Sequence, residues 1–293
     1  MKTSSSHPRP VEYHTVKNYK SLYGLSLFQI YVLLSYFREV KHPAGYSKFS
    51  PKHVLWSLYF LTSYPLRLTA ARTFGVSERT FEKYVWYCIR LISEIDNVSK
   101  IIRCDVRMML TQFLLFIEIN FEDRFKGRVK GQNNYVSLDG TDFSIYDRKP
   151  FDSRWYSFKL NRAAIRYEVG VCISTGEIVW FNGGHKAGRY NDLELARQDF
   201  TSQLLPGELA IADKGYDDPR FFVTPYSRFL SRKCLKNIMA RHENENQRIK
   251  SFFCMRHMYR HGWEKHNLCF EAVIKLVQIT LQNGQPLPPL CIT

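Results

Sequence analysis

Two short apolar runs in the second half of this chain each end at an aspartate with a glycine close behind it. Residues 135–138 (YVSL) precede Asp139, and residues 209–212 (LAIA) precede Asp213. Short apolar runs bounded by turn residues predict buried strands, and ligands of α/β sheets gather where such strands end. The pattern therefore predicts a mixed sheet covered by helices, with two carboxylates at the carboxyl ends of its strands.

A glutamate on a predicted helix supplies a third carboxylate. Glu243 follows Asp213 in the chain and lies in a basic segment of helical composition. Two strand-end aspartates and a helical glutamate form an all-oxygen ligand set, which suits Mg²⁺ or Mn²⁺. Paired metals of this kind catalyse phosphodiester displacement. Asp139, Asp213 and Glu243 therefore indicate a nuclease or a strand-transfer enzyme.

Helical phase divides the segment around Glu243 into two faces. At 100° per residue, Glu243 shares a polar face with Asn246, Gln247 and Lys250. A carboxylate, two amides and a lysine on one face suit a metal-bound phosphate. The adjacent apolar stripe contains Ile238, His242, Ile249, Phe252 and Phe253.

The first 120 residues show helical periodicity, and strand patterns begin at residue 135. We divide the chain into a polar arm (1–20), an all-helical domain (21–120), a charged linker (121–134), an α/β domain (135–285) and a tail (286–293). Predicted helices cover 22–40, 51–62, 68–95, 103–119, 192–205, 236–255 and 270–282. Predicted strands cover 135–141, 165–174, 177–181 and 208–212.

Residues 68–88 have the pattern of a DNA-binding helix-turn-helix. Ala71 is small where two helices approach, Gly75 permits the positive φ of a tight turn, and Ser77 is an N-cap candidate. An ordinary helical hairpin is the alternative. In a recognition helix, the outward positions would meet the major groove. These positions are Ser77, Glu78, Arg79, Glu82 and Lys83.

The charge balance favours a polyanionic partner. The 293 residues contain 42 basic and 27 acidic side chains, a net charge of +15. Seven scattered cysteines without a metal-ligand spacing are typical of a reduced, intracellular protein. The longest apolar stretches are shorter than the roughly 20 residues of a membrane span. We expect a DNA-binding protein without a membrane segment.

Several segments together resemble a DDE transposase of the PIF/Harbinger type and its bacterial insertion-sequence relatives. The resemblance covers roughly residues 65–285. It rests on residues 137–142 (SLDGTD), 155–159 (WYSFK), 166–171 (RYEVGV), 175–180 (TGEIVW), 187–188 (AG), 191–193 (NDL), 212–216 (ADKGY) and 241–243 (RHE), with Asn246, Arg248 and Lys250.

This resemblance implies an RNase H-like catalytic domain preceded by a helix-turn-helix domain. It implies that Asp139, Asp213 and Glu243 hold two Mg²⁺ or Mn²⁺ ions. The enzyme would cut the ends of a DNA element, and the freed 3′-hydroxyl would then attack target DNA. It also implies that the protein forms a homo-oligomer on DNA. In a eukaryote the protein would act in the nucleus, where a separate Myb-like partner is possible, and in a bacterium it would act in the cytoplasm. The DNA contacts expected near the site are Lys214, Tyr216, His242, Asn246, Arg248 and Lys250.

Two departures from the family and two other functions leave alternatives open. Glu245 stands where relatives commonly have an apolar residue, so it competes with Glu243 for the role of third metal ligand. Its helical phase places Glu245 on the apolar stripe, where Arg241 or Arg248 can pair with it. Gly184 and His185 replace a proline–aromatic pair. The other functions are a domesticated DNA-binding protein that does not cut, and a simple nuclease of the same fold.

Overall fold

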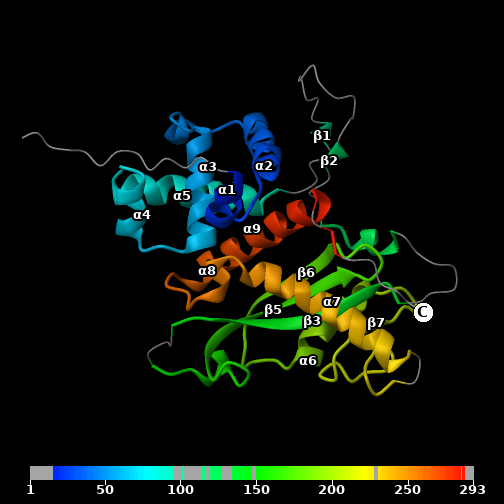
Figure 1. The fold of residues 1–293 in the computed structure, drawn as a ribbon. Coiled ribbons are helices and arrows are strands. Elements are labelled where there is room, and N and C mark those ends of the chain that lie inside the picture. The colour runs from blue at the N-terminus through cyan, green and yellow to red at the C-terminus, as the bar shows by residue number, and fades with distance from the viewer. Residues whose placement is uncertain are drawn as a thin grey trace, which may run out of the picture.

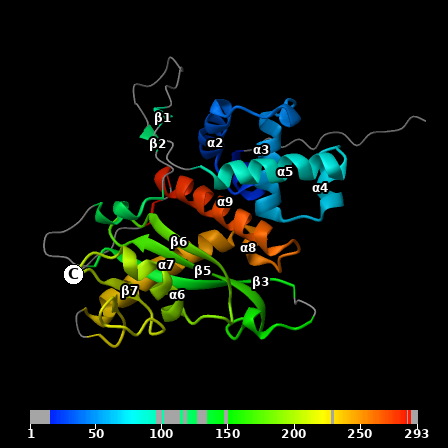
Figure 2. The same ribbon diagram turned by 180° about the vertical axis from the view of Figure 1, so that it is seen from behind.

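The computed structural model describes residues 16–95, 100–101, 114–115, 119–126, 134–146, 150–227, 230–284 and 286–287. A six-stranded mixed sheet is flanked by helices, and a layer of N-terminal helices lies on one side of it (Figures 1 and 2). The α/β layout and the helical N-terminal part predicted from the sequence are both present.

The N-terminal layer consists of α1 (Val16–Tyr23), α2 (Leu27–Glu39), α3 (Pro51–Ser63), α4 (Arg67–Thr73) and α5 (Glu78–Ser93). The predicted start at Ser50 is confirmed, because α3 begins at Pro51 and the Ser50 amide donates to His53 Nδ1 at 3.0 Å. The predicted arm ends earlier than expected, since α1 begins at Val16. The predicted helix over 103–119 lies mostly outside the described residues. Leu114–Leu115 within it form β2, which pairs with β1 (Lys100–Ile101) and is not helical.

The sheet is built around β3 (Val136–Ser144). On one side β3 pairs antiparallel with β5 (Arg162–Cys172), which pairs with β6 (Ile178–Lys186) and, near its start, with β4 (Tyr156–Ser157). On the other side it pairs in parallel with β7 (Ala210–Ala212), followed by β8 (Phe222–Val223). Strand β6 runs past its predicted end through Gly184 and His185, because a bulged pairing with β5 outweighs the low strand propensity of glycine.

Helices cover both faces of this sheet. On one face lie α6 (Asp192–Gln198) and the 3₁₀ turn η4 (Phe200–Gln203). On the other lie α7 (Arg232–Lys250) and α9 (Trp263–Gln282), with the short α8 (Phe253–Arg256) between them. The predicted helix over 236–255 is interrupted after Lys250, and the one over 270–282 begins earlier, at Trp263. Helix α9 separates the N-terminal layer from the sheet in both views (Figures 1 and 2).

One continuous apolar core connects the N-terminal layer to the sheet. It runs from α2, α3 and α5 through α8 and α9 to β5. Tyr64 after α3 stacks on Tyr259 before α9, with the two ring centroids 5.6 Å apart. The boundary drawn near residue 120 from the sequence therefore falls within a shared core rather than between two cores.

The start of the predicted linker is packed against the sheet. Phe121–Phe125 form a 3₁₀ turn, η2, in which Arg124 is 1% exposed. Its guanidinium donates to both carboxylate oxygens of Glu208, at 2.8 and 3.2 Å, and lies against the rings of Phe121 and Phe125. The sequence predicted a charged linker over 121–134. Its burial fixes residues 121–126 in place, and residues 127–133 lie outside the described part.

Buried histidines give the fold an acid-sensitive component. His266 in α9 is fully buried, with Nδ1 2.8 Å from the Tyr167 hydroxyl, and burial lowers its pKa from 6.5 to about 3. The unfolded chain binds this proton near pH 6.5 and the folded chain does not. The contribution of neutral His266 to stability is therefore complete above pH 6.5 and is lost as the pH falls towards 3.

We expect His266→Gln to flatten this pH dependence by up to about 1.4 kcal/mol per pH unit below pH 6.5. The measurement is urea unfolding of both proteins at several pH values, with the exposed His257→Gln as the control. A His266→Gln slope equal to that of the wild type would show that His266 is charged in the folded state.

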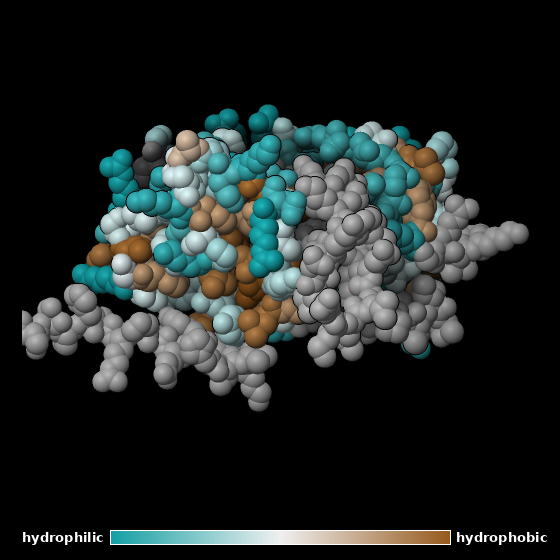
Figure 3. Space-filling model, turned by 90° about the horizontal axis from the view of Figure 1, so that it is seen from above, coloured by the Kyte–Doolittle hydropathy of each residue, from teal (hydrophilic) through white to brown (hydrophobic). Residues whose placement is uncertain are grey.

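The surface over the N-terminal layer mixes hydrophilic and apolar residues (Figure 3). Among the described residues, none of the helices combines the length and the apolar character needed to cross a membrane. The described cysteines, Cys88, Cys172, Cys234, Cys254 and Cys269, are free thiols, as their scattered spacing predicts.

Candidate acidic site

Asp139 and Asp213 lie at matching positions on two neighbouring parallel strands. The register pairs Leu138 of β3 with Ala212 of β7, and the next residue on each strand is the aspartate. Neighbouring strands lie about 4.8 Å apart, so the sheet itself brings the two carboxylates together. Strand β7 ends before Asp213 as predicted, whereas β3 continues past Asp139 to Ser144, because β5 pairs with it along its full length.

A third carboxylate, Asp192, lies between these two strand ends. Asn191 caps α6 and places Asp192 in its first turn. A side-chain carbon on Gly215 would lie 3.0 Å from Asp213 Oδ1 and 3.2 Å from Asp192 Oδ2, and one on Gly140 would lie 2.8 Å from Asp192 Oδ1. Both glycines are therefore needed for the close approach of Asp192. The sequence analysis placed Asp192 only at a helix start, although its segment was part of the family resemblance.

Electrostatics place Glu243 beside the same group. The pKa of Asp139 is raised to about 6, first by burial and then by the negative charges of Asp213, Asp192 and Glu243, against the opposing charge of Lys159. Four carboxylates thus share one electrostatic region at the interior strands β3 and β7. We call Asp139, Asp192, Asp213 and Glu243 the acidic site. Its excess negative charge favours a bound cation, either a proton or a metal.

The structure distinguishes the two glutamates that competed for this position. Glu243 is exposed on α7 and accepts a hydrogen bond from Gln247 at 2.8 Å. Glu245 is fully buried, pairs with Arg248 at 3.4 Å, and has a pKa raised to about 7 by burial. Glu243 is among the negative charges that raise the pKa of Asp139, and its role as the third ligand stays a prediction.

Polar residues around the acidic site hold its members in position. Asn246 on α7 donates to Asp139 Oδ2 at 2.9 Å. Arg166 on β5 pairs with Asp192 at 3.1 Å. Lys250 lies close enough that Glu243 and Asp139 both raise its pKa, although burial lowers it more. Cationic groups next to a carboxylate cluster can hold the phosphate of a ligand whose other side faces a metal.

Three residues expected to contact DNA are buried. Tyr216 is fully buried, and its hydroxyl donates to Glu168 at 3.1 Å. His242 is 1% exposed and lies 2.9 Å from the Ser137 hydroxyl, and Asn246 is occupied by Asp139. A direct contact of these three with DNA is contradicted by their burial, because each serves to pack or position its neighbours. Lys214 is exposed, and Lys250 and Arg248 are half-buried.

The described residues do not form a closed metal cage. Within this part of the chain, no group of three or more His, Cys, Asp or Glu side chains is arranged so that it could hold a metal ion. Two of the predicted ligands are hydrogen-bonded within the fold, since Asp139 and Glu243 each accept from a side-chain amide. The three predicted ligands, Asp139, Asp213 and Glu243, are close enough to interact electrostatically, but their side chains are not arranged around a single metal position.

The helix pair of residues 67–93 has the expected turn and cap. Gly75 between α4 and α5 has a φ of +64°, and the Ser77 side chain accepts from the Thr80 amide. Of the outward positions, Arg79 and Lys83 are exposed, with Lys83 over the ring of Tyr46.

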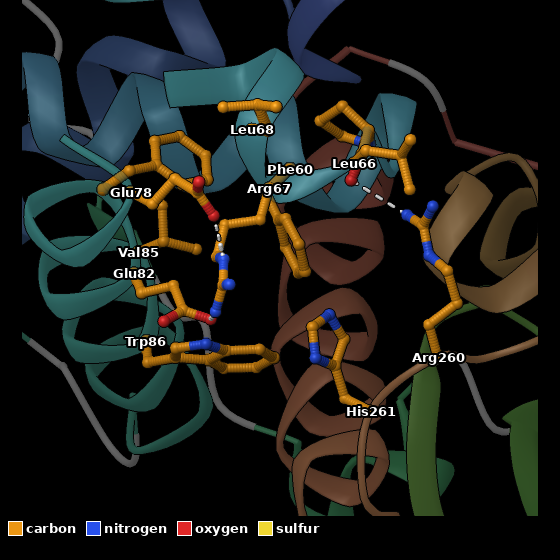
Figure 4. A pocket seen from close by; sticks show the side chains of 12 residues that line it. Phe60, Leu66, Arg67, Leu68, Glu78, Glu82, Val85, Trp86, Arg260 and His261 are labelled. Atoms are coloured by element: carbon orange, nitrogen blue, oxygen red, sulfur yellow. Dashed lines mark hydrogen bonds and ion pairs between the residues drawn. The ribbon is translucent and has the colours of Figure 1, made fainter. Parts of the chain in front are cut away.

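Glu78 and Glu82, also expected to meet DNA, instead pair with Arg67. Arg67 lies across a pocket of about 420 Å³, and its side chain reaches both glutamates, at 3.2 Å for Glu82. The aromatic ring of Trp86 lies against the same pocket (Figure 4). This ion pair lies at the surface, and a contact of the two glutamates with DNA stays a prediction. No member of the acidic site lines this pocket.

No protein-family model matches the chain, and neither a curated protein nor a solved structure shows significant similarity to it.

Proposed function

We propose that this protein is a metal-dependent DNA endonuclease and strand-transfer enzyme of the DDE transposase class. The observation that carries the proposal is that Asp139 and Asp213 directly follow paired residues of the adjacent parallel strands β3 and β7, with Glu243 on α7 adding to the negative charge that acts on Asp139. A protein that only binds DNA does not need a group of carboxylates at its sheet, since their negative charges repel phosphate.

The sheet topology supports an RNase H-like fold for the catalytic part. Three antiparallel strands, β6, β5 and β3, are continued by two parallel strands, β7 and β8. The two aspartates lie on the first and fourth of these strands in chain order, at the centre of the sheet. This arrangement places them where both sides of the sheet can contribute further side chains, from α6 and from α7.

In this proposal Asp139, Asp213 and Glu243 hold Mg²⁺ or Mn²⁺, which when bound activates the attacking oxygen and stabilises the leaving oxygen. The chain's own residues do the rest. Lys159 and Lys250 hold the phosphate at the acidic site, Asn246 orients Asp139, and Arg166 keeps Asp192 in place. The α4–α5 pair serves as a helix-turn-helix that positions DNA through Arg79 and Lys83.

The partners follow from this activity. Duplex ends of a DNA element and a target duplex are the substrates, and two copies of the chain acting together on paired ends require a homo-oligomer on DNA. In a eukaryotic nucleus a separate Myb-like protein would assist end recognition, and in a bacterium the protein would act at the nucleoid.

The test is cleavage and joining in vitro. The full chain is incubated with Mg²⁺ or Mn²⁺ and a plasmid carrying the repeats that flank its gene. We expect nicks at the repeat ends and covalent joining of the new 3′ ends to a second plasmid. Cleavage without joining would identify a simple nuclease. Specific binding without cleavage at any metal concentration would contradict the proposal.

A DNA-binding protein that does not cut is the second candidate. The absence of a closed group of three metal ligands among the described residues favours it. It predicts repeat binding that is unaffected by metal and by substitution of Asp213.

The two glutamates provide a matched pair of variants. We expect Glu243→Gln to lower metal-dependent cleavage at least about a hundredfold, because a ligand and its charge are lost. Glu245→Gln, in the same helix, should leave cleavage near the wild-type level, since Glu245 is buried beside Arg248. The measurement is the single-turnover cleavage rate. The reverse ranking would assign the third ligand to Glu245.

A further inference from the structure

Two aromatic side chains next to β4 are unusually exposed for their size. Phe158 is 84% exposed and Phe151 is 71% exposed, with the half-buried Tyr156 between them. The Tyr156 ring is 5.3 Å from that of Phe158 and 6.4 Å from that of Phe151. We call Phe151, Tyr156 and Phe158 the aromatic platform. Grouped apolar side chains in solvent indicate a binding surface rather than a packing requirement.

The platform is tied to the acidic site by a chain of polar contacts. Ser157 between Tyr156 and Phe158 donates to Asp142 Oδ2 at 2.6 Å, and Arg166 donates to Asp142 Oδ1 at 2.7 Å. Arg166 in turn pairs with Asp192 at 3.1 Å. The hairpin that joins β4 to β5 is thereby held at a fixed position relative to the acidic site.

The same hairpin places positive charge between the platform and the acidic site. Lys159, next to Phe158, acts electrostatically on Asp139, Asp192 and Lys250. Arg162, across the turn, is also exposed. Exposed aromatic rings interleaved with cations are the combination that binds single-stranded nucleic acid, because rings stack on bases while cations meet the phosphates.

We propose that the aromatic platform stacks on unpaired bases of the DNA strand that enters the acidic site. This rests on the proposed function and specifies the form of its substrate: a strand whose bases are unpaired next to the phosphate that is cut. Trp155 in the same segment is only 5% exposed, with Lys186 over its ring, so it does not belong to the platform.

The experiment compares two DNA probes in the presence of EDTA, so that it does not depend on cleavage. One probe is a blunt duplex, and the other carries a single-stranded extension with 2-aminopurine in place of adenine. We expect Phe158→Ala to weaken binding of the extended probe about tenfold, the effect of losing one base–aromatic stack, and to leave blunt-duplex binding unchanged. The change in 2-aminopurine fluorescence on binding should be lost as well.

Two further variants make the result specific. Phe158→Tyr retains the ring and should bind like the wild type. Phe28→Ala removes a 49% exposed ring from α2, which α9 separates from the sheet, and should also bind like the wild type. All variants should melt at the wild-type temperature, since these side chains are exposed.

Equal binding of the extended probe by Phe158→Ala and the wild type would overturn the inference. A change of oligomeric state in Phe158→Ala, with base stacking intact, would also overturn it and identify a protein interface. If Phe158→Ala loses base stacking but the wild type never cleaves DNA, the proposed enzyme is refuted and the aromatic platform is retained.

Discussion

Asp139→Asn and Asp213→Asn are each expected to slow DNA cleavage at least about a thousandfold, equivalent to ~4 kcal/mol of transition-state stabilisation. Each substitution removes one negative charge and keeps the shape of the side chain. In the structure the two aspartates occupy matching positions on β3 and β7, so neither can be replaced by a neighbour at the same place. The measurement is the single-turnover cleavage rate at saturating Mn²⁺.

The control for both variants is Asp199→Asn, which neutralises an exposed aspartate at the end of α6. It should cleave like the wild type. Blunt-duplex binding should be retained or strengthened in the two site variants, because negative charge near phosphate is removed. Wild-type cleavage by either site variant would contradict the assignment of the acidic site.

Arg124→Ala is expected to destabilise the protein by about 3–5 kcal/mol, because it leaves the Glu208 carboxylate buried without its partner. Both side chains are almost fully buried, at 1% and 3% exposed, and the contact is a double hydrogen bond. The loss of the guanidinium packed between Phe121 and Phe125 adds to the effect. Equilibrium unfolding in urea measures the change.

Two comparisons separate the ion pair from a general effect of removing arginine. Arg220→Ala removes a 70% exposed arginine from Asp218, which keeps Arg197 as a partner, and should change stability little. Replacing Arg124 and Glu208 together by Met should recover most of the loss. A stability of Arg124→Ala within error of the wild type would show that Glu208 is protonated or hydrated.

The parts of the fold fixed by local periodicity were predictable. The apolar runs before Asp139 and Asp213 place β3 and β7, and the phase of α7 puts Glu243 on the acidic side and Glu245 in the core. Ser50 and Ser77 mark helix starts, because an N-cap is a local requirement.

Features that depend on distant contacts were not predictable from local patterns. Asp192 joins the acidic site because it lies close to Gly140 and Gly215, which are distant from it along the chain. Arg124 is buried because Glu208, far along the chain, receives it. Tyr216 was expected at DNA, whereas the packed sheet encloses it. In each case tertiary burial decides, and a single sequence does not report it.

The central claim is that Asp139 and Asp213, with Glu243, hold a divalent metal at the interior strands β3 and β7. The most direct measurement is a crystal structure of the full chain with Mn²⁺, located by its anomalous scattering. We predict a peak bound by carboxylate oxygens of Asp139 and Asp213, at about the 2.1 Å typical of such small hard cations. A peak bound elsewhere, or an acidic site that stays without metal at saturating Mn²⁺, would contradict the account.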